Sequence, residues 1–407
     1  MTLSKYGTPN GDNGRRKCMI LRSFDYVEYK GEDNEWSIDA LILEKVNLLV
    51  GKNASGKSRT IDKIAAFAGL IFGYQKTTFE VINSVNFEVE LTENEYTYIY
   101  SLSTKNRDIT SEKLTINGVE KINRLLNGSG QMYYENEKKD IAFQALDNNL
   151  IVASRRDNIQ HPYLENLYKW ASGIRFFDFG SSRNMGQRNM LATVNLDEFT
   201  NDEKIIYETF RVNEHYLKAI REFGEKFNKK IIDDMRLIGY DLVNLSIETN
   251  PYTAVIEENN SPLFMLCVKE KDRNAKLYQT GMSQGMFRAL SLLIQVNYNI
   301  MKNTSSIILV DDIGEGLDFE RSAKLIALLI ELAETNDNIQ LIMSTNDRFV
   351  MNNVPLEYWQ VIQRNGGECK IFNYHNSKEK FDEFQYMGLN NFDFLATDFI
   401  NSKWEKA

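Results

Sequence analysis

The chain has 407 residues, 43% of them hydrophobic and 26% charged, so it is long enough for one large globular domain or two ordinary ones. The 48 Lys and Arg residues and 57 Asp and Glu residues give a net charge of −9, which argues against a protein that coats nucleic acid through bulk charge. The three His and three Cys residues form no CxxC, HxxxH or HExxH pair, which leaves little material for a zinc site or a Cys–His catalytic centre.

The first predicted elements are strands that lead into a helix. After a polar tail, apolar patterns predict three strands, over residues 18–29, 36–43 and 46–50. Residues 57–74 then have the spacing of an amphipathic helix. Short segments rich in Val, Tyr and Thr between residues 85 and 118 predict an antiparallel meander.

The second half of the chain changes character. Residues 195–235 are strongly charged and have helical spacing, and strands are predicted over residues 237–248 and 263–269. Helices and strands then alternate, with helices over 282–301 and 320–332 and strands over 307–310 and 339–344. This alternation predicts a parallel sheet covered by helices.

The segment between the third strand and the first helix predicts nucleotide binding. It reads G-K-N-A-S-G-K-S and matches the phosphate-loop pattern G-x-x-x-x-G-K-[ST]. Backbone amides and the positive end of the following helix hold phosphates in such loops, where Lys57 supplies a charge and the Ser58 hydroxyl can ligate Mg²⁺. We therefore expect ATP and Mg²⁺ to contact Gly51, Lys52, Asn53, Ala54, Ser55, Gly56, Lys57, Ser58 and Arg59.

A second candidate cluster follows the apolar strand over residues 307–310, which ends in Asp311 and Asp312. Buried strands rarely end in adjacent carboxylates unless something neutralises them, because an unpaired buried charge is costly. We expect Asp311 to hold the metal and Asp312 to orient or deprotonate the attacking water. The alternative is that Asp311 and Asp312 lie in an exposed turn with no catalytic role. The spacing between these acids and other motifs favours a catalytic site.

That spacing resembles the ABC-type ATPase superfamily. Ser283 begins the helix just before the strand that ends at Asp311, and Asp318 follows the same acid at a short interval. Ser283 and Gly285 match the L-S-G-G-Q signature of the family, and Asp318 matches its D-loop residue. The resemblance implies that all three contact ATP across a homodimer, and it places Asn346 at the switch position.

The chain departs from the family at two positions. Asp312 replaces the usual catalytic Glu and is shorter by one methylene, so Glu315 is a second candidate for the general base. Asn346 stands where the family usually has His, although its amide can still hydrogen-bond to phosphate. Both departures favour slow hydrolysis, or ATP used mainly as a conformational switch.

The length of chain between the phosphate loop and the signature points to one branch of the superfamily. More than half of the chain lies between Lys57 and Ser283, and no paired heptads predict the coiled-coil arm of SMC proteins. The chain looks more like SMC- and OLD-related AAA ATPases, many of which act in bacterial antiphage defence.

The resemblance also implies a fold and its division into parts. We expect an α/β fold, a P-loop NTPase of the ABC-ATPase type with a mixed sheet, flanking helices, an antiparallel β subdomain and a helical insertion. The expected parts are residues 1–155 with the P-loop, a mainly helical lobe over 156–240, and residues 241–407 with the remaining motifs.

Two weaker signals lie in the middle of the chain. The resembled family has a glutamine, the Q-loop residue, after an early strand, and Gln160 after an expected strand at 150–153 is our candidate, with Gln75 as the alternative. Four cations could line a nucleic-acid groove, although nearby acids favour a solvated surface. They are Arg183, Arg188, Lys229 and Lys230.

Three hypotheses for the function remain open. The first is an ATPase that dimerises around Mg-ATP and controls a separate effector. OLD-family proteins often carry a nuclease domain, and the segment after His375 is too short for one. We therefore expect the separate effector to be a nuclease. The second is an ATP-gated scaffold with little turnover, and the third is a DNA-repair ATPase without a coiled-coil arm. DNA or a phage component are further candidate partners.

Cysteine use and hydropathy predict the compartment. The cysteines are far apart in sequence, and no secretory signal precedes them. The longest apolar run, residues 64–74, is about half the ~20 residues of a membrane-spanning helix. We therefore expect a cytoplasmic protein with no membrane contact.

Overall fold

A long mixed sheet organises the molecule. The computed structural model describes residues 19–73, 84–106, 108–146, 148–179, 212–249 and 264–402. Within these residues, 14 strands join one sheet in the order β10-β14-β15-β3-β16-β17-β2-β1-β4-β5-β6-β7-β8-β9. Their bounds are β1 Ile20–Glu28, β2 Trp36–Ile42, β3 Val46–Val50, β4 Val85–Glu93, β5 Tyr96–Lys105, β6 Asp108–Ile116, β7 Val119–Arg124, β8 Ser129–Tyr134, β9 Lys139–Gln144, β10 Ile174–Asp178, β14 Ser306–Asp311, β15 Ile339–Ser344, β16 Trp359–Asn365 and β17 Glu368–Phe372.

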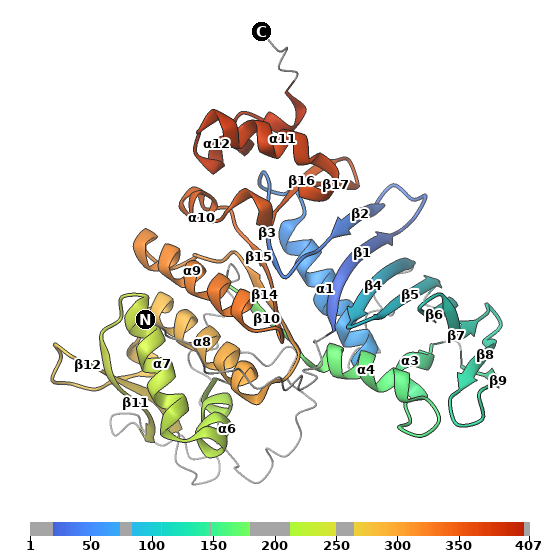
Figure 1. Cartoon of the computed structure of the whole chain (residues 1–407), viewed down its shortest axis with the longest axis horizontal. Coiled ribbons are helices and arrows are strands. Elements are labelled where there is room, and N and C mark those ends of the chain that lie inside the picture. The colour runs from blue at the N-terminus through green and yellow to red at the C-terminus, as the bar shows by residue number, and fades with distance from the viewer. Residues whose placement is uncertain are drawn as a thin grey trace, which may run out of the picture.

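The sheet has a parallel part and an antiparallel part. Strands β10, β14, β15, β3 and β16 run parallel to one another, whereas β1, β2 and β4 to β9 pair antiparallel as a meander. The hairpin partner of β16, β17, joins the two parts because it also pairs with β2. In Figure 1 the antiparallel strands extend to the right of the parallel ones.

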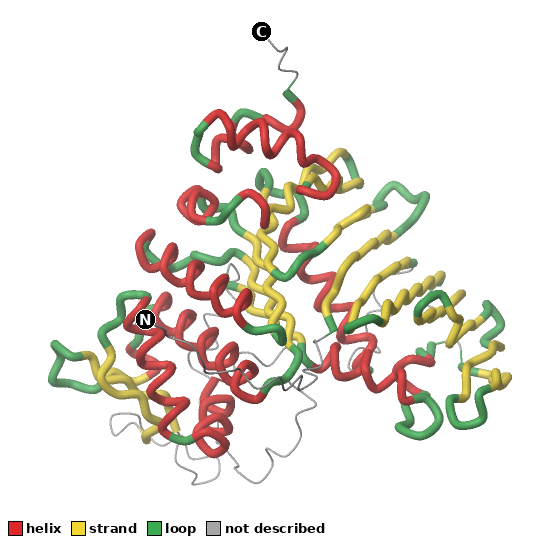
Figure 2. Tube along the Cα trace, viewed as in Figure 1, coloured by secondary structure: helices red, strands yellow, loops and turns green. Residues whose placement is uncertain are grey.

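Helices cover the parallel strands (Figure 2), and a small second sheet accompanies them. The helices are α1 Lys57–Phe72, α3 Ile151–Ser154, α4 Pro162–Ser172, α6 Val212–Phe223, α7 Glu225–Leu237, α8 Gln284–Lys302, α9 Phe319–Thr335, α10 Arg348–Asn353, α11 Tyr374–Met387 and α12 Asn391–Ala396. The second sheet comprises β11 Leu242–Thr249, β12 Phe264–Glu270 and β13 Leu277–Tyr278. None of the described helices is long and apolar enough to cross a bilayer.

The parallel strands separate two hydrophobic cores because their side chains alternate between the faces of the sheet. In β3, Leu48 packs in the core with α6 to α9, whereas Leu49 packs in the core with α1, α4 and the meander. All five residues of β3 are buried, which explains why four of them are apolar, and the buried Asn47 side chain hydrogen-bonds to the backbone of Glu44. The predicted buried strand is therefore confirmed, together with the mixed α/β fold class.

Helix α1 lies between the parallel strands and the meander (Figure 1). Phe67 of this helix is 1% exposed, and it stands among four aromatic rings, three from the antiparallel strands and one from α4. Its ring centroid lies 5.3 to 6.1 Å from those of Phe24, Phe87, Tyr100 and Trp170. Because α1 also packs on β14 and β15, the helix that follows the phosphate loop is held between the two parts of the sheet.

The middle of the chain differs from the expected organisation. Residues 151–154 form helix α3, whereas the sequence predicts a strand at 150–153. Within the range expected as a mainly helical lobe, 156–240, strand β10 pairs with β14 inside the large sheet, and the other described elements are the helices α4, α6 and α7. The backbone of β10 pairs with the edge of β14. This pairing joins segments far apart in the sequence, so the local helical pattern around β10 does not reveal it. Residues 180–211, with Arg183 and Arg188, lie outside the described residues, as does Gln75.

Candidate nucleotide site

The P-loop, residues 51–56, joins β3 to α1 at the carboxyl edge of the parallel strands. A Cβ atom on Gly51 would lie 2.5 Å from the carbonyl oxygen of Ile362, so only glycine lets the loop pass the end of β16. Gly56 has a φ of 108°, in the left-handed region that favours glycine. Its carbonyl accepts hydrogen bonds from the amide and hydroxyl of Thr60, at 2.8 and 2.9 Å, which starts the helix.

The side chain of Lys57 hydrogen-bonds to the backbone of the P-loop. Its ammonium group donates to the carbonyl oxygens of Gly51 and Lys52, at 3.0 and 3.2 Å, and the residue is only 4% exposed. Burial lowers the pKa of Lys57, while Asp312 and Asp311 oppose that effect. A buried ammonium that donates to neutral carbonyls and faces two carboxylates is well placed to exchange those carbonyls for an anion.

Asp311 is the last residue of β14 and lies beside the start of α1. Its carboxylate accepts hydrogen bonds from the hydroxyl groups of Ser344 and Ser58. Burial raises the pKa of Asp311, and repulsion from Asp178 adds to this, whereas the two hydroxyl groups and Lys57 oppose it. The structure therefore brings together Ser58 and Asp311, which belong to two motifs far apart in the sequence.

Asp312 follows with a φ of 51°, an uncommon backbone conformation for a residue other than glycine. Its amide donates to the Ser344 hydroxyl at 3.0 Å, and its carboxylate accepts from the Asn346 side-chain amide at 3.1 Å. Burial and the neighbouring Asp311 raise the pKa of Asp312, with a smaller contribution from Glu315. A carboxylate with a raised pKa is a better proton acceptor, as a general base requires.

The signature residues form a second group with the D-loop. Ser283 caps α8, where its hydroxyl accepts from the Met286 amide at 3.2 Å and also hydrogen-bonds to the Tyr240 hydroxyl. A Cβ atom on Gly285 would lie 2.5 Å from the carbonyl oxygen of Gly316. The first turn of α8 therefore packs directly on the loop that follows Asp312.

Asp318 and Arg288 hold that loop in place. Asp318 caps α9 by accepting from the Arg321 amide at 3.0 Å, and it forms an ion pair with the Arg321 side chain at 2.6 Å. Arg288 of α8 donates to the carbonyl oxygen of Glu315 at 2.6 Å and to that of Phe179 at the end of β10. The hydrogen bonds of Ser283 and Asp318 thus run to the first turns of their own helices and, for Ser283, also to Tyr240, but not to the P-loop.

The side chain of Arg59 contacts the antiparallel strands. Its guanidinium group stacks on the buried ring of Trp36, 4.2 Å from the ring centroid, and forms an ion pair with Glu28. The structure therefore places Arg59 next to the antiparallel strands, one residue after Ser58.

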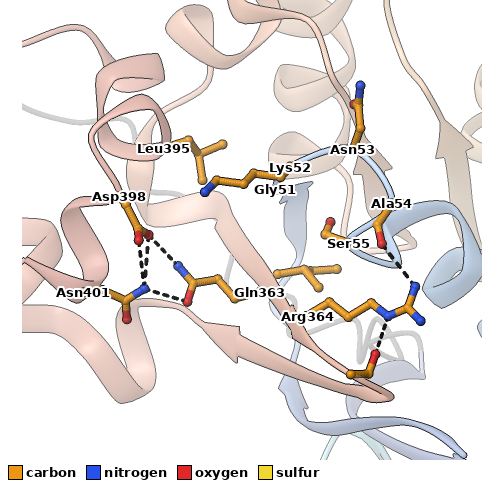
Figure 3. A pocket seen from close by; sticks show the side chains of 12 residues that line it. Gly51, Lys52, Asn53, Ala54, Ser55, Gln363, Arg364, Leu395, Asp398 and Asn401 are labelled. Carbon is orange, nitrogen blue, oxygen red and sulfur yellow. Dashed lines mark hydrogen bonds between the residues drawn. The ribbon is translucent and has the colours of Figure 1, made fainter.

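A cavity of about 450 Å³ opens along the outer side of the P-loop (Figure 3). One wall carries a polar network in which the Gln363 amide donates to Asp398 at 3.0 Å. Lys52 reaches across the cavity, and Arg364 lies beside the loop. The buried hydroxyl of Ser55 has no hydrogen-bond partner. The lining residues are Gly51, Lys52, Asn53, Ala54, Ser55, Ile362, Gln363, Arg364, Gly366, Leu395, Asp398 and Asn401.

Gln160 lies apart from both groups. Its carbonyl oxygen accepts from the Glu135 amide after β8, and it precedes α4, whose Tyr168 stacks on Phe72 at the end of α1 far from the P-loop. The expected Q-loop role of Gln160 has no geometric support, because the strand thought to deliver it is the helix α3.

Sequence reasoning missed one acid of the site and assigned no role to two further residues. Asp178 ends β10 directly opposite Asp311 in the sheet. The local signal was weak, because β10 reads Ile-Arg-Phe-Phe-Asp and shares with β14 only its final Asp and part of its apolar character. Ser344 lies close to Asn346 in the sequence and Arg288 lies close to Gly285, but their roles depend on contacts with residues far away in the sequence.

The site fits Mg-ATP by its donor chemistry. The hydroxyl of Ser58 and the carboxylate of Asp311 are hard oxygen ligands of the kind that Mg²⁺ takes beside phosphate. Among the described residues, no group of three or more His, Cys, Asp or Glu side chains could hold a metal alone. Mg²⁺ binding here would therefore depend on the phosphates and water.

Comparison with known families agrees with this geometry. A family model described as "AAA domain, putative AbiEii toxin, Type IV TA system" matches residues 46–352. The chain belongs to this AAA family. The match runs from β3 through the P-loop and both acids into α10, so it includes both groups of motif residues. No curated protein matches the chain.

Solved structures show the same fold as this AAA protein. A crystal structure of an Smc head bound to the C-terminal winged-helix domain of ScpA has a TM-score of 0.51 and 14% identity, covering 86% of this chain and 96% of that one. An Smc head with an extended coiled coil, bound to the C-terminal domain of ScpA from Pyrococcus furiosus, has a TM-score of 0.50 and 12% identity, covering 90% and 100%. The predicted SMC-like ABC or AAA ATPase fold is thus confirmed.

Proposed function

We propose that this AAA protein hydrolyses ATP, forms a homodimer around Mg-ATP and thereby controls a separate effector protein. The observation that carries the proposal is the convergence of Lys57, Ser58, Asp311 and Asp312 at one edge of the sheet. Another segment, at the end of β15, adds Ser344 to the same cluster.

The residues of this cluster have separable roles. The ammonium group of Lys57 leaves the carbonyls of the P-loop for the β- and γ-phosphates. The hydroxyl of Ser58 and the carboxylate of Asp311, which lie within hydrogen-bond distance of each other, would hold Mg²⁺ beside the phosphates. Bound Mg²⁺ would neutralise charge on the phosphates during transfer. Asp312 accepts a proton from the attacking water, while Asn346 fixes the carboxylate by its hydrogen bond.

A second copy would complete the site. Ser283 is exposed at the N-terminus of α8, and its hydrogen bonds run to Met286 and Tyr240 instead of the P-loop. An exposed N-terminus of a 19-residue helix favours an anion. In a head-to-tail pair, this helix end would cap the γ-phosphate held by the partner, so that ATP joins the two copies.

Two variants test the composite site. Lys57→Ala should weaken binding of a fluorescent ATP analogue about 100-fold, since hydrogen bonds to charged groups contribute up to about 3 kcal/mol. Ser283→Arg should leave binding by the monomer intact but abolish ATP-dependent association in sedimentation velocity. Wild-type ATP hydrolysis by the Ser283→Arg variant would contradict the composite-site proposal.

The effector and a role in antiphage defence belong to the same proposal. The family description names a toxin of a toxin–antitoxin system, and the Asp312 and Asn346 departures favour an ATP-dependent switch. We expect a nuclease as the separate effector and cytoplasmic action. Co-purification from the native host followed by mass spectrometry tests this, and recovery of the chain alone in both ATP and ADP would contradict it.

Two alternative functions can be separated by hydrolysis measurements. A gate with little turnover should show single-turnover hydrolysis that accelerates only with a partner, so fast turnover by the purified chain would exclude it. An SMC-like repair ATPase should be stimulated by plain duplex DNA. Indifference to DNA would favour effector control over repair.

A further inference from the structure

The turn between α7 and β11 connects the signature serine with the D-loop acid. Tyr240 in this turn is 6% exposed, and its hydroxyl hydrogen-bonds to that of Ser283 at the start of α8. The guanidinium of Arg321 lies over the Tyr240 ring, 4.5 Å from the ring centroid. The same guanidinium forms an ion pair with Asp318 at 2.6 Å. One buried tyrosine therefore contacts Ser283 directly and Asp318 through Arg321.

Two further contacts hold the Tyr240 hydroxyl within reach of the signature helix. Gly239 has a φ of 96°, in the left-handed region that favours glycine, and its carbonyl accepts from Arg321 at 3.4 Å. Farther back in α7, the fully buried carboxylate of Asp234 accepts from the side-chain amide of Asn297 in α8 at 2.8 Å. The two helices pack side by side (Figure 1), so the turn at the end of α7 stays next to the start of α8.

The hydroxyl of Ser283 has a single proton to donate. Its oxygen already accepts from the Met286 amide at 3.2 Å, so this proton is the group that remains for a ligand. Burial raises the pKa of Tyr240, whereas Arg321 and the bond from Ser283 oppose that rise, as donation to the phenolic oxygen does. The oxygens of the terminal phosphate of Mg-ATP act as acceptors. Tyr240 and a γ-phosphate at Ser283 therefore compete for the same proton.

We propose that Tyr240 is an autoinhibitory latch, which holds the hydroxyl of Ser283 in the free chain until the ATP bound by a second copy takes it. The inference rests on the proposed ATP-dependent dimer and adds a control on its formation. The latch weakens the dimer, because each copy loses one hydrogen bond before its Ser283 forms another. It also gives the lobe of α6, α7 and β11 a hydrogen bond that changes when the interface forms.

Tyr240→Phe tests the latch because it removes only the hydroxyl group and keeps the ring beside Arg321. A hydrogen bond between neutral groups corresponds to about a 2- to 10-fold change in an equilibrium constant. A symmetric dimer contains two such sites, so we expect sedimentation velocity in saturating ATP to give a dimer dissociation constant about 5- to 100-fold lower than wild type. A purely structural role of the hydroxyl would leave this constant unchanged or raise it.

The matched control is Tyr216→Phe, which removes another buried tyrosine hydroxyl from the same lobe. The Tyr216 hydroxyl hydrogen-bonds to the Asn228 side chain and the Leu245 carbonyl, both at 2.9 Å. Its loss should lower the melting temperature and leave the dimer dissociation constant at the wild-type value.

An unchanged or higher dissociation constant for Tyr240→Phe, or an equal decrease for Tyr216→Phe, would overturn the latch and leave the proposed function intact. Dimerisation of Tyr240→Phe under conditions that leave the wild type monomeric would support the latch directly. If neither chain dimerised in saturating ATP, the proposed function and the latch would both be contradicted.

Discussion

One hydroxyl group fixes both acids of the site. The Ser344 side chain at the end of β15 donates to the carboxylate of Asp311 and accepts from the amide of Asp312 at 3.0 Å. Ser344 is fully buried, so these bonds have no competition from bulk water. We interpret Ser344 as a positioning residue that keeps Asp311 ionised and holds Asp312 in its unusual backbone conformation.

Replacing Ser344 with Ala should slow ATP hydrolysis and shift its pH dependence. Loss of a hydrogen bond to a charged group corresponds to about 1.5–3 kcal/mol, or a rate about 10- to 100-fold lower. Burial already raises the pKa of Asp311, and the Ser344 bond opposes that rise, so its loss raises the pKa further. Because the metal needs the ionised carboxylate, activity should be lost at a higher pH than in wild type as the solution is acidified.

A pH–rate profile of kcat/KM checks this prediction. Ser344→Thr retains the hydroxyl group, so the acidic limb of its profile should stay at the wild-type position even if the added methyl group lowers the rate. An unchanged acidic limb in Ser344→Ala would show that Ser344 does not act through Asp311.

Individual site residues were predictable where the motif is contiguous. Lys57 and Ser58 stand in one loop whose pattern carries its own chemistry, and Asp311 ends a recognisable buried strand. Asp178 was not found, because its role depends on pairing with β14, a strand far away in the sequence. The strand expected before Gln160 was wrong, since a short apolar segment fits a strand and a helix equally well.

At the scale of elements, the signature helix and the D-loop behave as one body. Gly285 of α8 packs on the backbone of Gly316, and the guanidinium of Arg288 bridges the carbonyls of Glu315 and Phe179. These contacts tie the residues between Asp312 and α9 to α8. A change at Asp312 on hydrolysis would reach the signature through these contacts.

Gly285→Ala should break this contact. The new Cβ atom would lie 2.5 Å from a backbone carbonyl oxygen, and backbone cannot yield as a side chain can. We expect a loss of about 1–3 kcal/mol in the free energy of unfolding and loss of ATP-dependent dimerisation, while the monomer still binds ATP. Urea denaturation and sedimentation in ATP measure the two effects.

The matched control is Gly281→Ala, just before the signature. Its Cβ atom would meet only the flexible end of Leu277, at 3.2 Å. The free energy of unfolding should change by about 0.5 kcal/mol or less. Equal effects of the two substitutions would show that the packing of Gly285 on the D-loop has no special role.

The alternating elements of the last third were predictable because each has a local pattern. The strand at Ile339–Ser344 has the predicted bounds, and the helices around it differ by a few residues at their ends. The place of β10 in the sheet was not predictable, since a five-residue strand next to a helix has no periodicity of its own. Sheet order depends on non-local pairing, which a single sequence does not reveal.

At the scale of the whole molecule, α1 links nucleotide binding to the packing of the sheet. Its first residues continue the P-loop, and its apolar face packs in the core that the meander and the parallel strands share. The aromatic cluster around Phe67 therefore holds the antiparallel strands against α1, the helix that follows the P-loop. The stability of the chain should depend on this cluster more than on any surface feature.

Phe67→Ala tests that dependence. Truncating a buried Phe leaves a cavity and should reduce the free energy of unfolding by about 3–5 kcal/mol, which urea denaturation followed by tryptophan fluorescence can measure. Tyr386→Ala, at a side chain that is 95% exposed, should change it by no more than about 0.5 kcal/mol. Saturating Mg-ATP should raise the melting temperature of both variants, because a ligand that binds only the folded state stabilises it by mass action. Equal stability of Phe67→Ala and Tyr386→Ala would show that the cluster does not join the two parts. If Mg-ATP stabilised neither variant, the proposed binding of Mg-ATP by the folded chain would be contradicted.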